Sequence, residues 1–159
     1  MSVKQVEIAC KRILNMKNIL LINADLYKTK ATDFLIEAYA EGVVESPENH
    51  HFKYLAIGDL LFNFNKQFVH SSPAVLESDL SRAWSLLEWA NHVVVFCPVY
   101  ASHIPSKING FFERLFNQSD NSVHIYRHKT LEGRSARIIS ILDDQLFERW
   151  LEDKNFAFM

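Results

Sequence analysis

Four short apolar runs alternate along the chain with longer segments whose apolar residues recur at helical spacing. The clearest runs are NILLIN (Asn18 to Asn23) and VVVFC (Val93 to Cys97), which are short, almost free of charge and typical of strands buried on both faces. Two further runs, Phe52 to Ile57 and Ser135 to Leu142, also predict strands. Strands that alternate with helices indicate an α/β domain with a parallel sheet covered on both faces.

The segments between and after these strands predict four helices: Thr32 to Gly42, Ser72 to Trp89, Pro105 to Phe116 and Gln145 to Lys154. Thr32 or Asp33 is expected to cap the first helix, and Gly42 to end it. Right-handed crossovers leave few topologies, and among them the strand order 2-1-3-4-5 is the favoured one. That order requires a fifth strand after residue 154, where NFAFM is either a stub of the strand or evidence of its truncation.

The most specific motif begins where the third predicted strand ends. Pro98 is followed by VYASHI, by Pro105 and then by GFFERLF, residues 110–116. This pattern resembles the flavodoxin-like NAD(P)H:quinone oxidoreductases, a family that includes the ancillary reductases of bacterial potassium efflux systems. The resemblance implies a three-layer flavodoxin-like fold over residues 17–159, with residues 1–16 as an N-terminal extension.

The same resemblance implies a flavin-dependent NAD(P)H:quinone oxidoreductase that moves two electrons as hydride through bound FMN, with FAD as the less favoured flavin and NADPH or NADH as co-substrate. It further implies a quinone-type substrate, a homodimer and, by family analogy, a membrane-transporter partner. The alternative is a flavodoxin-fold regulatory or interaction protein in which flavin binding is weak or lost, because fold alone does not fix function.

In this fold the phosphate of the flavin lies at the loop after the first strand, because open N–H groups and the helix dipole attract an anion there. The loop spans Ala24 to Thr32 and offers two hydroxyls and two ammonium groups, although a merely solvated loop has the same composition. Asp25 stands where the family has a histidine, and it places a carboxylate beside the expected phosphate, at a cost of about 1 kcal/mol or more. Lys30, which replaces a serine, can offset that charge.

By the resemblance, the cofactor-binding residues are expected to be Thr29, Lys30, Thr32, Pro98, Val99, Tyr100 and Ala101. His103 and Tyr126 are the candidate catalytic residues on the substrate side, although a loop histidine without function would look the same. The small Ala101 and the adjacent acids Asp143 and Asp144 favour the flavin-free alternative, since they offer a flavin ring little to stack on and a negative neighbour.

Composition and charge exclude several other classes of protein. A chain of 159 residues with a net charge of −2 gives no electrostatic case for nucleic acid. Its apolar runs fall short of a membrane span, and its N-terminus lacks a secretory signal, so we expect a cytoplasmic protein. Cys10 and Cys97 show no motif spacing and are expected to be reduced thiols; the seven histidines show no metal-ligand spacing, and no metal site is predicted.

Overall fold

The computed structural model describes residues 16–64, 76–99, 104–116 and 131–142. They contain a four-stranded sheet, all of whose pairs are parallel, in the order β2-β1-β3-β4. The strands are β1 (Asn18–Asn23), β2 (His51–Ala56), β3 (His92–Pro98) and β4 (Ser135–Ile141). The helices are α2 (Lys30–Val44), the short 3-10 turn η1 (Ile57–Asp59), α3 (Ser78–Trp89) and α4 (Ser106–Phe116).

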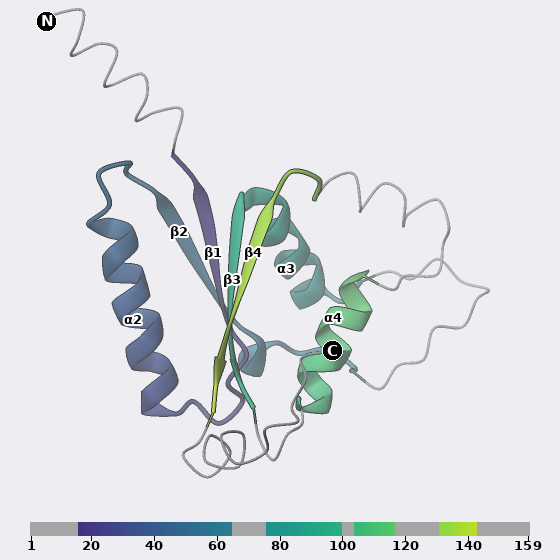
Figure 1. Cartoon of the computed structure of the whole chain (residues 1–159). Helices are drawn as coiled ribbons and strands as arrows, with labels where there is room; N and C mark the ends of the chain where they lie inside the picture. The colour runs from purple at the N-terminus through teal and green to yellow at the C-terminus, as the bar shows by residue number, and fades with distance from the viewer. Residues whose placement is uncertain (1–15, 65–75, 100–103, 117–130, 143–159) are drawn as a thin grey trace, which may run out of the picture.

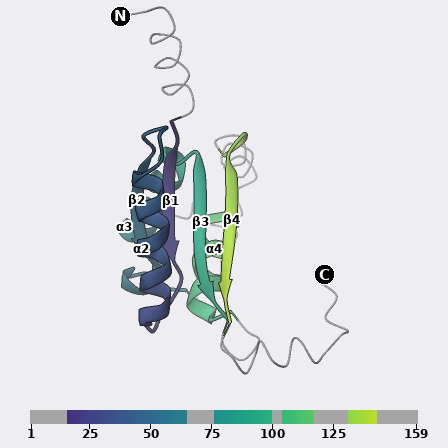
Figure 2. The same cartoon turned by 60° about the vertical axis from the view of Figure 1, so that its left-hand side comes forward.

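Helix α2 covers one face of the sheet, and α3 and α4 cover the other, so the elements form three layers (Figures 1 and 2). This arrangement confirms the predicted α/β class and the first four strands of the order 2-1-3-4-5. No fifth strand occurs within the described residues. The predicted helix 145–154, the NFAFM segment and all but Met16 of the N-terminal extension 1–16 lie outside them.

The two central strands are buried on both faces, as the sequence predicts. In β1, Leu20 and Ile22 face the core beneath α3 and α4, whereas Leu21 faces α2. In β3, Val94 and Phe96 complete the α2 side, and the Phe96 ring meets Tyr39 of α2 edge-on, with centroids 5.8 Å apart. A strand packed on both faces has no solvent-facing side, which explains why these runs contain so few polar residues.

Two helix starts differ from the prediction. Helix α2 begins at Lys30, because the Thr29 side chain accepts a hydrogen bond from the Thr32 amide and so provides the cap that we expected from Thr32 or Asp33. The same helix continues through Gly42, which does not end it. Helix α3 begins at Ser78 rather than at residues 72–73, and Leu76 and Glu77 precede it in non-helical conformation.

The GFFERLF motif of α4 serves the packing of the helix. Phe111 and Arg114 are buried, and the Arg114 guanidinium forms an ion pair with Glu77, the residue that precedes α3. A Cβ on Gly110 would lie 2.6 Å from the Cβ of Phe64 and 2.8 Å from its carbonyl oxygen. Glycine therefore allows the chain at Phe64 to cross α4 closely, so the motif is explained by structure.

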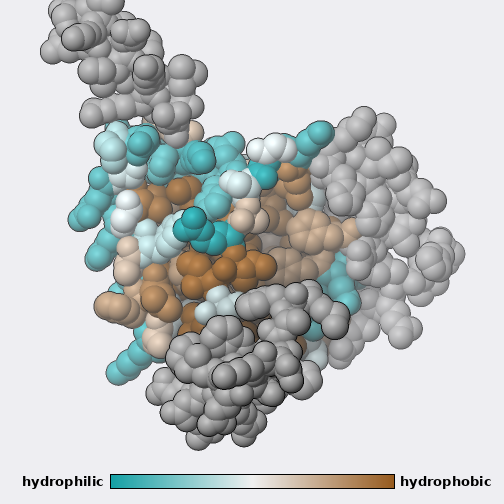
Figure 3. Space-filling model, viewed as in Figure 1, coloured by the Kyte–Doolittle hydropathy of each residue, from teal (hydrophilic) through white to brown (hydrophobic). Residues whose placement is uncertain are grey.

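Strands β2 and β4 are the two edges of the described sheet. In β4, Ile138 is 70% exposed, and hydrophobic residues gather over the middle of the face that Figure 3 shows. Among the helices of the described ranges, none is both long enough and apolar enough to cross a membrane.

Candidate functional site

The candidate site lies where β1 and β3 end side by side. The Ala24 amide, just after β1, donates a 2.9 Å hydrogen bond to the Phe96 carbonyl of β3 and so holds the two strand ends together. The loop from Ala24 to Thr29 then leads into α2, which runs back along the sheet (Figure 1). This is the carboxyl edge of a parallel sheet, where open α/β folds place their ligands.

Asp25 organises this loop from within. Its side chain is almost fully buried, and Oδ1 accepts a 2.9 Å hydrogen bond from the Tyr27 amide. Oδ2 accepts from the Thr29 amide at 2.8 Å and from the Thr29 hydroxyl at 2.6 Å. The Asn23 side chain in turn accepts from the Asp25 amide at 2.7 Å. A buried carboxylate thus takes two backbone donors that an external anion would otherwise use.

The N-terminus of α2 stays partly open. Thr29 Oγ1 accepts from the Thr32 amide at 3.5 Å and lies 3.0 Å from Thr32 Oγ1, so both predicted hydroxyls are engaged with each other. Among the described residues, nothing accepts a hydrogen bond from the amides of Lys30 and Ala31. These two amides, the helix dipole and the exposed Lys30 ammonium remain for an anion.

A salt bridge connects the loop after β1 to η1, which follows β2. Lys28 has a positive φ of 52°, and its Nζ lies 2.7 Å from Asp59 Oδ1 of η1. Hydrogen bonding and charge attraction from Asp59 raise the pKa of Lys28 above its ordinary value. Lys107 of α4 donates a 2.8 Å hydrogen bond to the Gly58 carbonyl. The loops after β1 and β2 and the start of α4 are therefore linked at one edge of the sheet.

The residues expected along a flavin ring are only partly described. Pro98 is buried at the end of β3, and the Val99 amide donates a 2.9 Å hydrogen bond to the Ile141 carbonyl of β4, which engages that amide within the sheet. Tyr100, Ala101, His103 and Tyr126 lie outside the described residues, as do Asp143 and Asp144. Thr29, Lys30 and Thr32 are therefore the predicted residues that the structure brings together at α2, and Pro98 and Val99 end the neighbouring strand.

Sequence reasoning treats Asp25 as a like charge beside the expected phosphate, and it does not predict that Asp25 accepts hydrogen bonds from the loop amides. The available signal was the spacing of Asp25, Tyr27 and Thr29, because an aspartate often accepts from the amide two residues later. Asp59 was missed as well, since nothing in the local sequence pairs it with Lys28.

Other candidate chemistry is sparse in this part of the molecule. In the ranges that the structure describes, no three His, Cys, Asp or Glu side chains gather as a metal site. Cys97, just before Pro98 in β3, is buried, and burial raises the pKa of its thiol. A thiol that is protonated and covered is a poor nucleophile.

A family model described as "Flavodoxin-like fold" matches residues 17–152. No curated protein matches the chain. Among solved structures, an NAD(P)H:quinone oxidoreductase from Methanothermobacter marburgensis is similar, with a TM-score of 0.57 and 13% identity, and the match covers 86% of this chain and 92% of that one.

A proposed quinone reductase from Klebsiella pneumoniae matches with a TM-score of 0.58 and 12% identity over 79% of this chain. FerB, a flavoenzyme NAD(P)H:(acceptor) oxidoreductase from Paracoccus denitrificans, matches with a TM-score of 0.54 and 19% identity, also over 79% of this chain. The matches span 59% and 60% of the lengths of those two proteins. At these identities the likeness is one of fold.

Proposed function

The chain belongs to the flavodoxin-like fold family, and from this premise we propose that it is a flavin-dependent NAD(P)H:quinone oxidoreductase. The observation that carries the proposal is the open N-terminus of α2, beside the carboxyl end of β1. There the Lys30 and Ala31 amides have no acceptor among the described residues, and the Lys30 side chain is exposed. Solved structures with this fold include oxidoreductases that use NAD(P)H.

The loop fits a flavin phosphate at these open groups and not at the Tyr27 and Thr29 amides, which Asp25 occupies. Lys30 would neutralise the phosphate, and Pro98 would border the ring at the end of β3. FMN is the preferred flavin; when bound, it would supply the hydride chemistry between NAD(P)H and a quinone. The residues of the chain would bind and orient this group, and the sheet edge would keep water from one side of it.

Asp25 would limit the affinity of the site. Its carboxylate is held close to the loop amides, so a phosphate at the helix end meets a like charge in a partly solvated setting. We expect wild-type protein to bind FMN, and the Asp25→Asn variant to bind it about five- to tenfold more tightly, corresponding to ~1 kcal/mol. Lys30→Met should have the opposite effect and weaken FMN binding.

The test is a titration of purified protein with FMN and FAD, followed by quenching of flavin fluorescence, and then NADH or NADPH oxidation with a quinone. Glu45→Gln is a matched control, because it removes an exposed carboxylate from the far end of α2. Each variant is first checked for a cooperative thermal transition. If neither wild type nor folded Asp25→Asn binds either flavin, the proposal is wrong.

A second candidate function is a flavin-free regulatory or interaction protein with the same fold. Asp25 is the specific observation in its favour: at 1% exposed and with three hydrogen bonds from the loop, it acts as an internal anion that needs no ligand. This candidate would be favoured if the folded protein does not bind flavin and if added flavin leaves its thermal transition unchanged.

We also propose that the protein forms a homodimer at this edge. Tyr27 in the loop after β1 is 74% exposed, and Leu61, which follows η1, is 81% exposed. Large apolar side chains left open beside a ligand site favour a protein contact there. Light scattering of wild type and of Leu61→Ser would test it, since a dimer through this edge should weaken in the variant and a monomeric wild type would contradict it.

A further inference from the structure

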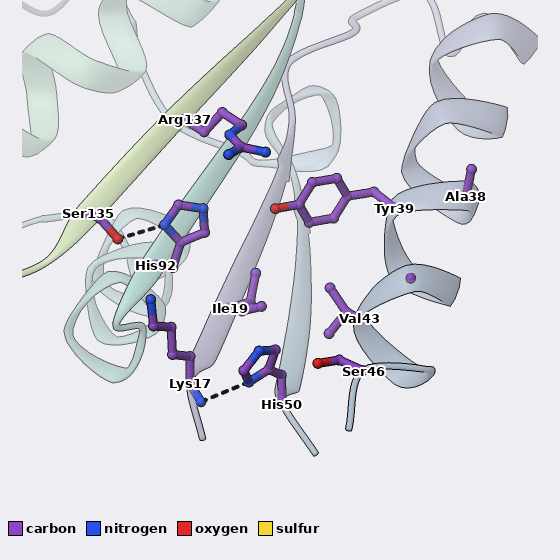
Figure 4. Close-up of a pocket in the computed structure, with 11 residues that line it drawn as sticks. Lys17, Ile19, Ala38, Tyr39, Val43, Ser46, His50, His92, Ser135 and Arg137 are labelled. Carbon is purple, nitrogen blue, oxygen red and sulfur yellow. Dashed lines mark hydrogen bonds between the residues drawn. The ribbon is translucent and has the colours of Figure 1, made fainter. Parts of the chain in front are cut away.

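A hollow lies at the end of the sheet opposite the candidate flavin site, where the strands begin. It has a volume of about 520 Å³ and lies between α2, the starts of β1, β3 and β4, and the turn before β2 (Figure 4). Its lining residues are Lys17, Ile19, Ala38, Tyr39, Gly42, Val43, Ser46, His50, His92, Ser135 and Arg137. The volume falls in the range of small-molecule sites, about 300–1,000 Å³.

Positive charge distinguishes this hollow. Lys17, from the residue before β1, and Arg137 of β4 both line it, and none of the described residues that line it is an aspartate or a glutamate. Glu37 and Glu41 of α2, and Glu45 just after it, border a separate hollow. The cations therefore face the hollow without an acidic partner in its wall.

Two histidines and a tyrosine add directed polar groups. His92 Nδ1 lies 2.7 Å from Ser135 Oγ, and His50 Nδ1 accepts a 3.2 Å hydrogen bond from the Lys17 amide. With Nδ1 as acceptor, a neutral His50 carries its proton on Nε2 and can donate it. Figure 4 shows the Arg137 guanidinium, the His92 ring and the Tyr39 hydroxyl turned toward the same space.

The electrostatic state of His92 agrees with this geometry. Burial, with the nearby charges of Lys17 and Arg137, lowers the pKa of His92 below its ordinary value. A neutral imidazole beside two cations indicates a positive potential that an anion would relieve. Ile19 and Val43 provide the apolar part of the wall, and the Tyr39 ring borders it as well.

We propose that this hollow binds a small molecule that carries a compact oxyanion, a carboxylate or a phosphate, on an apolar body. The Arg137 fork would hold the oxyanion, with Lys17 and the His92 ring beside it, because a guanidinium matches the geometry of both anions. The apolar body would lie against Ile19, Val43 and Tyr39. The site is at the opposite edge of the sheet from the flavin site and does not depend on it.

The experiment uses the full chain and three probes of similar size: benzoate, phenyl phosphate and the neutral benzamide. The His92 ring protons are followed by NMR during each titration and as a function of pH. We expect saturable shifts with one or both anions, a rise in the pKa of His92 when the anion is bound, and no saturable shift with benzamide. The two anion arms distinguish a carboxylate site from a phosphate site.

Arg137→Met is the decisive variant, since the side chain is exposed on an edge strand and its loss leaves the core unchanged. It should weaken anion binding about tenfold, as expected for a lost charged hydrogen-bonding pair. Arg82→Met removes an exposed arginine from α3 and is the matched control that should bind as wild type does.

Three outcomes would overturn the proposal: no saturable shift with either anion, equal shifts with benzamide, or unchanged affinity in folded Arg137→Met. Weaker anion binding by the Arg82→Met variant would also count against the proposal, because the loss of affinity would then reflect net charge alone.

Discussion

The carboxylate of Asp25 accepts hydrogen bonds from both the amide and the hydroxyl of Thr29, at 2.8 and 2.6 Å. Thr29 also caps α2, so one buried acid connects the end of β1 with the first turn of the helix. The loop that is expected to bind an external anion therefore already contains one, the Asp25 carboxylate.

Loss of the Asp25 carboxylate should therefore destabilise the fold. The Asp25→Ala variant leaves the Tyr27 and Thr29 amides and the Thr29 hydroxyl without their acceptor, and we expect a loss of about 2 kcal/mol in the free energy of unfolding. Urea denaturation measures it. Asp33→Ala, an exposed acid in the first turn of α2, should cost less than about 1 kcal/mol. Equal losses in the two variants would contradict the role of Asp25.

Alanine substitutions at Gly110 and Gly42 should have opposite effects on stability, because Phe64 lies close to Gly110 and no atom lies close to Gly42. Gly110→Ala would place a Cβ 2.6 Å from the Cβ of Phe64, so the crossing segment must move, at a cost of about 1–3 kcal/mol. Gly42→Ala lies in the last turn of α2, where the added Cβ would meet no atom within 4 Å, and it should stabilise the protein by about 0.5–1 kcal/mol. Thermal unfolding of both variants is the measurement. A Gly110→Ala protein as stable as wild type would show that the crossing is loose.

The ion pair between Glu77 and Arg114 should make stability depend on pH. Burial acts to raise the pKa of Glu77, but hydrogen bonds from its own amide and from Arg114 outweigh it, so the pKa lies below its ordinary value of 4.5. A lowered pKa contributes stability above pH 4.5, and this contribution is lost as the pH falls through the folded-state pKa.

Glu77→Gln should accordingly be less stable than wild type by about 2 kcal/mol at pH 7, since the buried Arg114 loses its ion pair with Glu77. The difference should shrink as the pH falls below 4.5. Urea denaturation at several pH values tests this, with the exposed Glu88→Gln on α3 as the control. A difference that stays constant with pH would exclude the ion pair as its cause.

Cys97 should resist alkylation in the folded protein. Its thiol is buried in β3, and burial raises its pKa, so little thiolate is available at neutral pH. Peptide mapping after iodoacetamide treatment should show Cys97 largely unmodified in buffer and fully modified in urea. Rapid labelling of the native protein would indicate that β3 opens readily.

The sequence by itself determined the architecture. The runs at residues 18–23 and 93–97 are apolar because both faces of these strands are covered, and this pattern survives in one dimension. Alternation with helical periodicity and the handedness of crossovers then left few strand orders, and the structure confirms the favoured one for the four described strands. The predicted starts of α2 and α3 differ from those in the structure, because capping depends on which side chain reaches which amide.

Tertiary structure alone decided the chemistry at both edges of the sheet. The family resemblance placed Asp25 in the expected phosphate loop, but only the folded loop shows that its oxygens accept hydrogen bonds from the loop amides. Lys17, His92 and Arg137 are far apart in the sequence, and they share one hollow because β1, β3 and β4 lie side by side. Local patterns record which residues are buried, whereas the meeting of distant charges follows from the order of the strands.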